Sequence, residues 1–192
     1  METIYISQSK KKAKIENAIV VYEDEASFRQ DPTLHSTWAP LHSQPQISSK
    51  GQRNSQKIFG AVSLYDGKYI YKHQEKYFNN ETYIEFLEEN LLKEMYNKGQ
   101  RIYLIQDNAG YHKHKEVYKW FKNNRKYIEV FQLPPYSPEF NLVERIWQYI
   151  RKEVTHNHYF ATPEELCSAL FGGLDKITRN PECILGYLNP FL

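Results

Sequence analysis

The sequence predicts an α/β fold in which a mixed sheet of five strands carries helices on both faces. Two short apolar runs, 18–22 and 101–107, reach an aspartate and are apolar on both faces, as central parallel strands are. An Asp-Gly pair at 66–67 divides two more runs into a hairpin, and segments with helical spacing separate the remaining strands. This order is typical of a mixed sheet covered by helices.

The first strand is predicted over residues 18–22, where apolar and β-branched residues follow one another. It stops at an acidic cluster whose middle residue is Asp24, so Asp24 is expected at the carboxyl end of the strand. Glu25 faces away from Asp24 in an extended chain. We therefore expect Glu25 to support a site at Asp24 from behind rather than to act as a ligand.

A long segment and a hairpin follow. Residues 31–56 are rich in Pro, Ser, Gln and His, which predicts a long ordered loop or a bent strand pair, with Trp38 as its apolar anchor. Strands are predicted over 57–64 and 69–77, because Gly67 supplies the positive φ of a tight turn.

The next helix is expected to begin at a cap on Asn80 and to end before Gly99 at the C′ position. The strand over 101–107 follows it and ends on Asp107. A second helix is marked by Val117, Trp120 and Phe121, and a strand over 127–133 comes next.

Two helices complete the chain. The stripe of the third helix consists of Val143, Ile146, Trp147, Ile150 and Val154. The fourth opens with Thr162 as N-cap, Pro163 at the first helical position and Glu165 as the capping-box partner, and it runs to about Ile177.

The composition indicates one soluble domain of 192 residues with a formal charge of only +2. A basic run near the start, Lys10 to Lys14, suggests a basic N-terminal arm or linker over residues 1–14, followed by a domain over 15–192. Cys167 and Cys183 lack metal-ligand spacing and are predicted to be reduced structural thiols. No run approaches a membrane span, so we expect a cytoplasmic protein with no membrane partner.

Asp24 and Asp107 end two strands that are predicted to be neighbours, at the edge where open α/β sheets bind ligands. Adjacent carboxylates repel each other, and a Mg²⁺ or Mn²⁺ ion would relieve this. Glu144, in the first turn of the third helix, is a candidate third ligand. The alternatives are that the aspartates only end their strands and that Glu144 only completes a capping pattern with Asn141.

Five segments closely resemble the catalytic domain of mariner-superfamily insertion-sequence transposases, a DDE superfamily endonuclease domain. They are Tyr22-Glu-Asp-Glu-Ala-Ser-Phe28, Thr37-Trp-Ala-Pro40, Ile58-Phe-Gly-Ala-Val62, Ile105-Gln-Asp-Asn-Ala-Gly-Tyr-His112 and Leu133-Pro-Pro-Tyr-Ser-Pro-Glu-Phe-Asn-Leu-Val-Glu-Arg-Ile-Trp147. The resemblance extends from about Lys12 to about Leu174. It implies a ribonuclease-H-like fold over residues 15–192 with Asp24, Asp107 and Glu144 as the catalytic and metal-binding DDE triad.

The resemblance also implies an activity. Two Mg²⁺ ions, or Mn²⁺ as a substitute, would drive DNA strand cleavage and strand transfer, one activating a water or a 3′-hydroxyl and the other steadying the leaving oxygen. The element would be excised from double-stranded DNA at the transposon ends and inserted into target DNA at TA dinucleotides by a synaptic homodimer acting at the nucleoid. The family's helix-turn-helix region does not fit into the short opening segment. Three alternatives stay open: the sequence is a fragment, it is the downstream reading frame of an element whose two frames are joined by frameshifting, or the DNA-binding part is a separate chain.

Some positions leave alternatives open. Leu142 stands where the family usually has Pro, and His42 where Gly is common, so the loop at His42 is expected to differ in shape. His112 and His114 lie near Asp107 and could contact a phosphate or a metal, but they are expected at the surface. Arg145 is either a phosphate contact or a salt-bridge partner, and Trp38, Trp120 and Trp147 are expected in the core. The rival functions are a ribonuclease-H-like nuclease without strand transfer and a non-catalytic, domesticated DNA-binding regulator.

Overall fold

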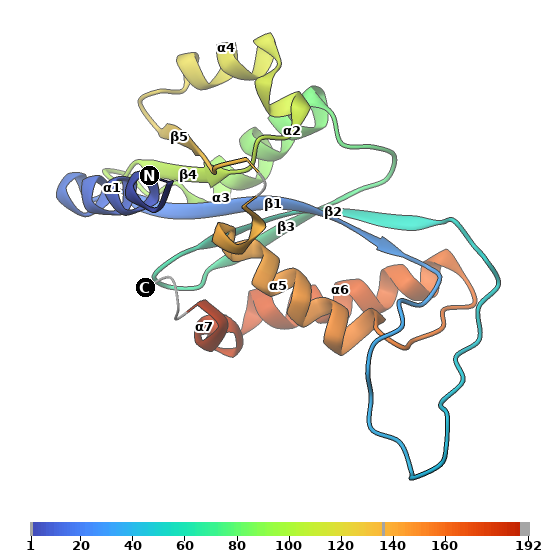
Figure 1. The fold of residues 1–192 in the computed structure, drawn as a ribbon. Helices are drawn as coiled ribbons and strands as arrows, with labels where there is room; N and C mark the ends of the chain where they lie inside the picture. Colours follow the sequence, from blue (N-terminus) through green and yellow to red (C-terminus); the bar gives the residue numbers. More distant parts are fainter. Residues whose placement is uncertain (1, 136, 189–192) are drawn as a thin grey trace.

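The computed structural model describes residues 2–135 and 137–188. Three pieces lie outside the described residues: Met1 of the predicted arm, Tyr136 of the proline-rich motif, and residues 189–192 of the predicted domain. Figure 1 shows the sheet as a central layer between two groups of helices. The predicted α/β class, with helices on both faces of a five-stranded sheet, is therefore confirmed.

The strands lie in the order β3-β2-β1-β4-β5 within one sheet. Their bounds are β1 Ile19–Arg29, β2 Ser55–Ser63, β3 Tyr69–Gln74, β4 Ile102–Gln106 and β5 Ile128–Gln132. β1 pairs antiparallel with β2, and β2 with β3, whereas β1 pairs parallel with β4, and β4 with β5. The sheet is mixed, and the predicted hairpin forms its antiparallel edge.

β1 is longer than predicted, which corrects the expected position of Asp24. Its antiparallel pairing with β2 continues past Gly60, the residue opposite Asp24, as far as Arg29. The parallel pairing with β4 stops earlier, at Tyr22 opposite Ile105. Asp24 therefore lies inside β1 rather than at its end, but just beyond the last parallel pair, where the edge between β1 and β4 opens.

The turn of the hairpin and the long loop before it use positive φ angles. Gly67 has a φ of 67°, and its N–H donates to the Ser63 carbonyl at 3.1 Å. The segment between β1 and β2 is a long loop that extends away from the body in Figure 1. Trp38 is fully exposed on it, so its predicted core position is wrong. His42 adopts a φ of 61°, the left-handed region that favours glycine, so the backbone shape suits the family's glycine.

One face of the sheet packs on a helical run and a second helix (Figure 1). The run is α2 Asn80–Phe86, the π-helical segment η1 Leu87–Leu92 and α3 Lys93–Met95, and the second helix is α4 Lys115–Asn123, after the 3-10 turn η2 Gly110–Lys113. The cap is Asn79 rather than Asn80, because the Asn79 side chain accepts the Thr82 N–H at 2.8 Å. Gly99 is not at the helix C′ position, since α3 ends at Met95.

The other face packs on the last helices of the chain. They are α5 Leu142–Ile150, its π-helical continuation η4 Arg151–Thr155, α6 Pro163–Arg179 and α7 Glu182–Leu188, preceded by the 3-10 turn η3 Pro138–Phe140. The predicted cap of α6 is confirmed, since Thr162 accepts the Glu165 N–H at 3.2 Å. Trp147 is fully buried on this face and Trp120 is buried on the other, as predicted. Cys167 and Cys183 are free.

The opening segment, predicted as a basic arm or linker, forms a helix. The helix α1 spans Glu2–Glu16, and Ala13 is fully buried against the core. Lys12 pairs with Glu129 of β5 at 2.7 Å, so part of the basic run serves the fold. Alanine, lysine and glutamate favour helices, which explains the difference. Within the described part of the chain, no helix is long and apolar enough to cross a membrane.

Candidate active site

The three predicted carboxylates line a single cleft of about 470 Å³. Asp24 comes from β1, Asp107 directly follows β4, and Glu144 lies in the first turn of α5. The two aspartates line the same cleft because β1 and β4 are parallel neighbours, as the sequence predicted. The structure thus brings together three acidic residues that are far apart in the chain.

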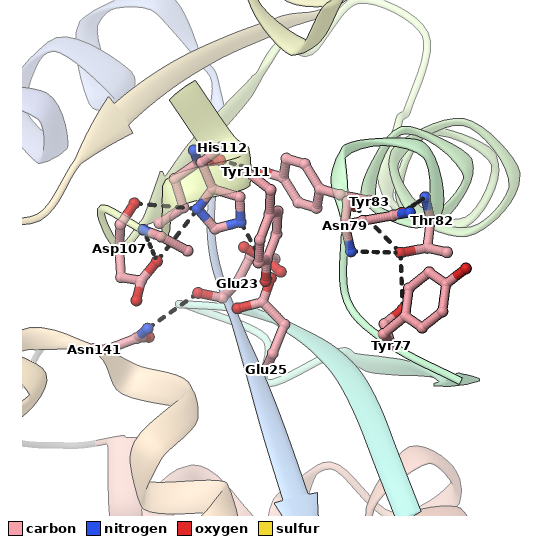
Figure 2. Close-up of polar contacts among 12 residues, drawn as sticks. Glu23, Glu25, Tyr77, Asn79, Thr82, Tyr83, Asp107, Tyr111, His112 and Asn141 are labelled. Atoms are coloured by element: carbon pink, nitrogen blue, oxygen red, sulfur yellow. Dashed lines mark hydrogen bonds and ion pairs between the residues drawn. The ribbon is translucent and has the colours of Figure 1, made fainter. Parts of the chain in front are cut away.

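Asn141 fixes the start of α5 on β1. Its side-chain oxygen accepts the Val143 N–H at 3.2 Å, which caps the helix. Its amide nitrogen donates to the Glu23 carbonyl at 3.0 Å (Figure 2). Asn141 is buried, so these bonds are shielded from water. The first turn of α5 is therefore held beside the residue that precedes Asp24.

The Glu144 side chain does not form the capping box with Asn141 that the sequence left as an alternative. In a capping box its side chain would accept the Asn141 N–H, but that N–H donates to the Pro138 carbonyl at 2.9 Å. The Glu144 carboxylate instead lies 3.8 Å from Arg151 and is partly exposed in the cleft. Arg145 lines a neighbouring hollow together with Glu144.

The proline-rich segment after β5 forms one wall of the cleft. Asn108 holds it in place, because its side chain donates to the Leu133 carbonyl. The Leu133 N–H donates to the Gln106 carbonyl at 2.7 Å, so the pairing of β4 and β5 continues to the start of this segment. Lys113 contributes a positive charge to the same cleft.

Asp24 is a buried carboxylate with excess negative charge around it. Burial raises its pKa well above the usual value, and the charges of Glu25, Glu144 and Asp107 raise it further. One carboxylate oxygen, Oδ2, accepts the indole N–H of Trp147 at 3.0 Å. Carboxylates that line one cleft with unneutralised charge fit a hard divalent cation such as Mg²⁺ or Mn²⁺.

His112 corrects the sequence prediction, because it is buried rather than at the surface. Its Nδ1 lies 3.2 Å from Asp107 Oδ1 and its Nε2 lies 3.1 Å from Glu25 Oε1, so the ring bridges the two carboxylates (Figure 2). The bond to His112 is the main cause of a lowered pKa at Asp107. Burial lowers the pKa of His112, but bonds to Asp107 and Glu25 and the charge of Glu23 outweigh it and raise the pKa to about 11.

A buried acidic group lies behind the cleft. Glu23 is fully buried, neither of its carboxylate oxygens has a hydrogen-bond partner among the described residues, and burial raises its pKa well above the usual value. Glu25, Glu23 and His112 offer atoms within 4.8 Å of one another. Glu25 also accepts the hydroxyl of Tyr111. Glu25 bonds to His112, whose positive charge balances this group, and the supporting role expected of Glu25 stays a prediction.

No sequence pattern used above identified His112 or the hydrogen bond of Trp147. The available signal for His112 was its position five residues after Asp107, where the 3-10 turn Gly110–Lys113 folds it back. His114, by contrast, is exposed as expected, and its ring accepts the Glu116 N–H at the start of α4.

Comparison with known proteins gives consistent results. The family model described as "DDE superfamily endonuclease" matches residues 19–167. The chain is 30% identical over 165 residues to the "Insertion element IS630 uncharacterized 39 kDa protein" of Shigella sonnei, covering 86% of this chain and 45% of that protein. The chain thus spans about half the length of this curated relative.

Two solved structures have a similar fold. The Mos1 mariner paired-end complex with Mn matches with a TM-score of 0.63 and 16% identity, covering 97% of this chain and 60% of that one. The catalytic domain of Mos1 mariner transposase matches with a TM-score of 0.54 and 14% identity, covering 97% and 90%. The fold is therefore the ribonuclease-H-like fold. With three acidic side chains in one cleft, this fold, and a family model that covers most of its length, the chain belongs to the DDE superfamily endonucleases.

Proposed function

We propose that this chain is the catalytic domain of a DNA transposase in which Asp24, Asp107 and Glu144 are the catalytic, metal-binding residues. The observation that carries the proposal is their convergence, from three separate elements, on one cleft in a DDE superfamily endonuclease. The IS630 relative is described as an insertion-element protein, and Mos1 has been solved in a paired-end complex and a strand-transfer complex. These descriptions support the same function.

The three carboxylates would hold two Mg²⁺ ions, or Mn²⁺ in their place. When bound, such ions supply Lewis-acid activation and charge neutralisation for displacement at phosphorus. The chain's own residues prepare the site: Asn141 fixes α5, and Asn108 fixes the proline-rich wall. Lys113 would attract a DNA phosphate to the cleft by its charge.

The partner would be double-stranded DNA, both at the transposon ends and at a TA target. Excision requires two ends to be held together, which favours a homodimer in the synaptic complex. Sequence recognition would come from a helix-turn-helix region, either elsewhere in a longer protein or in a separate chain.

The test is metal-dependent nicking of supercoiled plasmid DNA by Glu144→Gln. This change keeps size and polarity but removes the charge that Mg²⁺ requires. We expect nicking to collapse while the melting temperature and DNA binding persist. Glu153→Gln is the matched control, since Glu153 is exposed on the helical continuation of α5. Nicking by Glu144→Gln at near the wild-type rate would remove Glu144 from the site.

Joining must be measured separately from cutting. A pre-cleaved DNA end with a free 3′-hydroxyl is offered together with a target plasmid, and joined products are counted. Joined products are expected for a transposase. Nicking without joining would indicate a nuclease that only cuts, and neither activity in Mg²⁺ or Mn²⁺ would favour a DNA-binding regulator.

A further inference from the structure

Trp147 does more than fill the core between α5 and the sheet. Its ring is fully buried, with edge contacts to Phe28 at 5.8 Å and to Tyr69 at 6.4 Å between centroids. Its indole N–H donates to Oδ2 of Asp24 at 3.0 Å. A phenylalanine could occupy much of the same apolar space, so the N–H is what a tryptophan adds here.

Gly60 provides the space for this ring. Gly60 lies on β2 directly opposite Asp24. A Cβ atom at position 60 would lie 2.6 Å from Cη2 and 2.8 Å from Cζ2 of Trp147, closer than such atoms approach. A side chain at position 60 would therefore clash with the indole that binds Asp24 and with the Tyr69 hydroxyl, which lies 2.9 Å from the same Cβ position.

We propose that Trp147, seated on Gly60, is a positioning residue that fixes the orientation of the Asp24 carboxylate for cation binding. The inference rests on the proposed function and adds a residue to it. The indole engages Oδ2 and limits how the carboxylate can rotate. Because the indole N–H is only a donor, Trp147 does not compete for the cation. Trp147 follows Glu144 by three residues on α5, so one helix face delivers both a ligand and the donor that orients another ligand.

The experiment measures Mn²⁺ affinity by calorimetry in the absence of DNA, using Trp147→Phe and Gly60→Ala. Residues that orient metal ligands typically change metal affinity by about 10- to 100-fold, and we expect a loss in this range for both variants. Trp120→Phe is the matched control, because its indole N–H donates to Glu88, outside the cleft. It should bind Mn²⁺ within about twofold of wild type, since its donor does not touch a ligand.

A second measurement needs no change at Trp147 or Gly60. In ¹⁵N-labelled wild-type protein, the indole resonance of Trp147 should shift on addition of Mg²⁺ while that of Trp120 stays in place. The shift should disappear in Asp24→Asn, which keeps the side-chain volume. A Trp147 resonance that ignores Mg²⁺ would overturn the inference.

The outcomes separate the inference from the function. If Trp147→Phe binds Mn²⁺ like wild type while Glu144→Gln does not bind it, the inference is wrong and the proposed function stands. If the wild-type chain itself does not bind Mn²⁺ or Mg²⁺, both are overturned.

Discussion

Replacing Asp24 with asparagine should stabilise the metal-free protein, although it removes a proposed ligand. Asp24 is 9% exposed and lies near three other acidic side chains, so its charge is costly in the folded state. Asparagine is nearly the same size, and its side-chain oxygen can still accept the Trp147 indole N–H. The change therefore removes repulsion and desolvation while it retains the hydrogen bond.

The expected gain is about 1 to 2 kcal/mol, within the range of about 0.5 to 2 kcal/mol seen for single stabilising changes. For a chain of 192 residues, each 1 kcal/mol raises the melting temperature by about 2 to 4 °C. The rise for Asp24→Asn should thus be about 2 to 8 °C in EDTA. Asp66→Asn, at an exposed turn, is the control and should leave the melting temperature unchanged.

Saturating Mg²⁺ should reverse the order of the two proteins. A ligand at 100 times its dissociation constant adds about 2.7 kcal/mol to the stability of a protein that binds it. This exceeds the gain from Asp24→Asn, which lacks the ligand charge. The wild type should therefore melt below the variant in EDTA and above it in Mg²⁺.

The difference in melting temperature between Asp24→Asn and the wild type should also depend on pH. The pKa of Asp24 is raised in the folded protein, so the folded state holds this proton more firmly than the unfolded chain does. The stability from this group is present below its unfolded pKa and is lost as pH rises through the raised folded pKa. In EDTA, the advantage of Asp24→Asn should be largest at high pH and shrink as pH falls. A variant that melts at or below the wild type throughout would refute the reasoning.

Two further predictions concern charged residues around the cleft. Lys113→Gln should weaken DNA binding and reduce the slope of log affinity against log salt by about 1, because one phosphate contact is lost. Lys122→Gln, at an exposed position of α4, should leave the slope unchanged, and equal slopes for the two variants in a fluorescence titration would contradict this. His112→Leu should lower the free energy of unfolding in urea by about 3 kcal/mol, the low end for breaking a buried ion pair. The value is low because only the Glu25 carboxylate stays buried, at 8% exposed, whereas Asp107 is 49% exposed and can be solvated. A loss below about 1 kcal/mol would mean that His112 carries no charge.

The sheet and the convergence of the carboxylates could be predicted from local patterns. Apolar runs ending near Asp24 and Asp107 indicate parallel neighbours, and Asp66-Gly67 specifies the hairpin by turn geometry. Each pattern depends on residues that are adjacent in the chain. Such information is enough to order strands and to bring the ends of two of them to one edge.

The sequence predictions are wrong where contacts between residues distant in the chain determine the local structure. β1 continues past Asp24 because β2 pairs with it as far as Arg29. The sequence of β1 alone does not reveal which strand pairs with it or how far the pairing extends. His112 is polar and follows a loop-like Asn-Ala-Gly, which suggests exposure, yet Glu25 and Asp107 provide two acceptors that make its burial favourable. Hydrophobicity alone predicts Trp38 in the core, but Trp38 lies fully exposed on a loop that extends away from the body of the protein (Figure 1).

The helix α5 is the element that relates the parts of the candidate site to one another. Asn141, Glu144 and Trp147 are three residues apart and therefore lie on one face. Asn141 donates a hydrogen bond to the backbone carbonyl of Glu23, and Trp147 donates one to the carboxylate of Asp24. The same face of α5 therefore binds two consecutive residues of β1. Glu144 lies between these two attachments. The position of Glu144 relative to Asp24 is consequently set by the docking of α5 on β1 rather than by the proline-rich loop that precedes the helix.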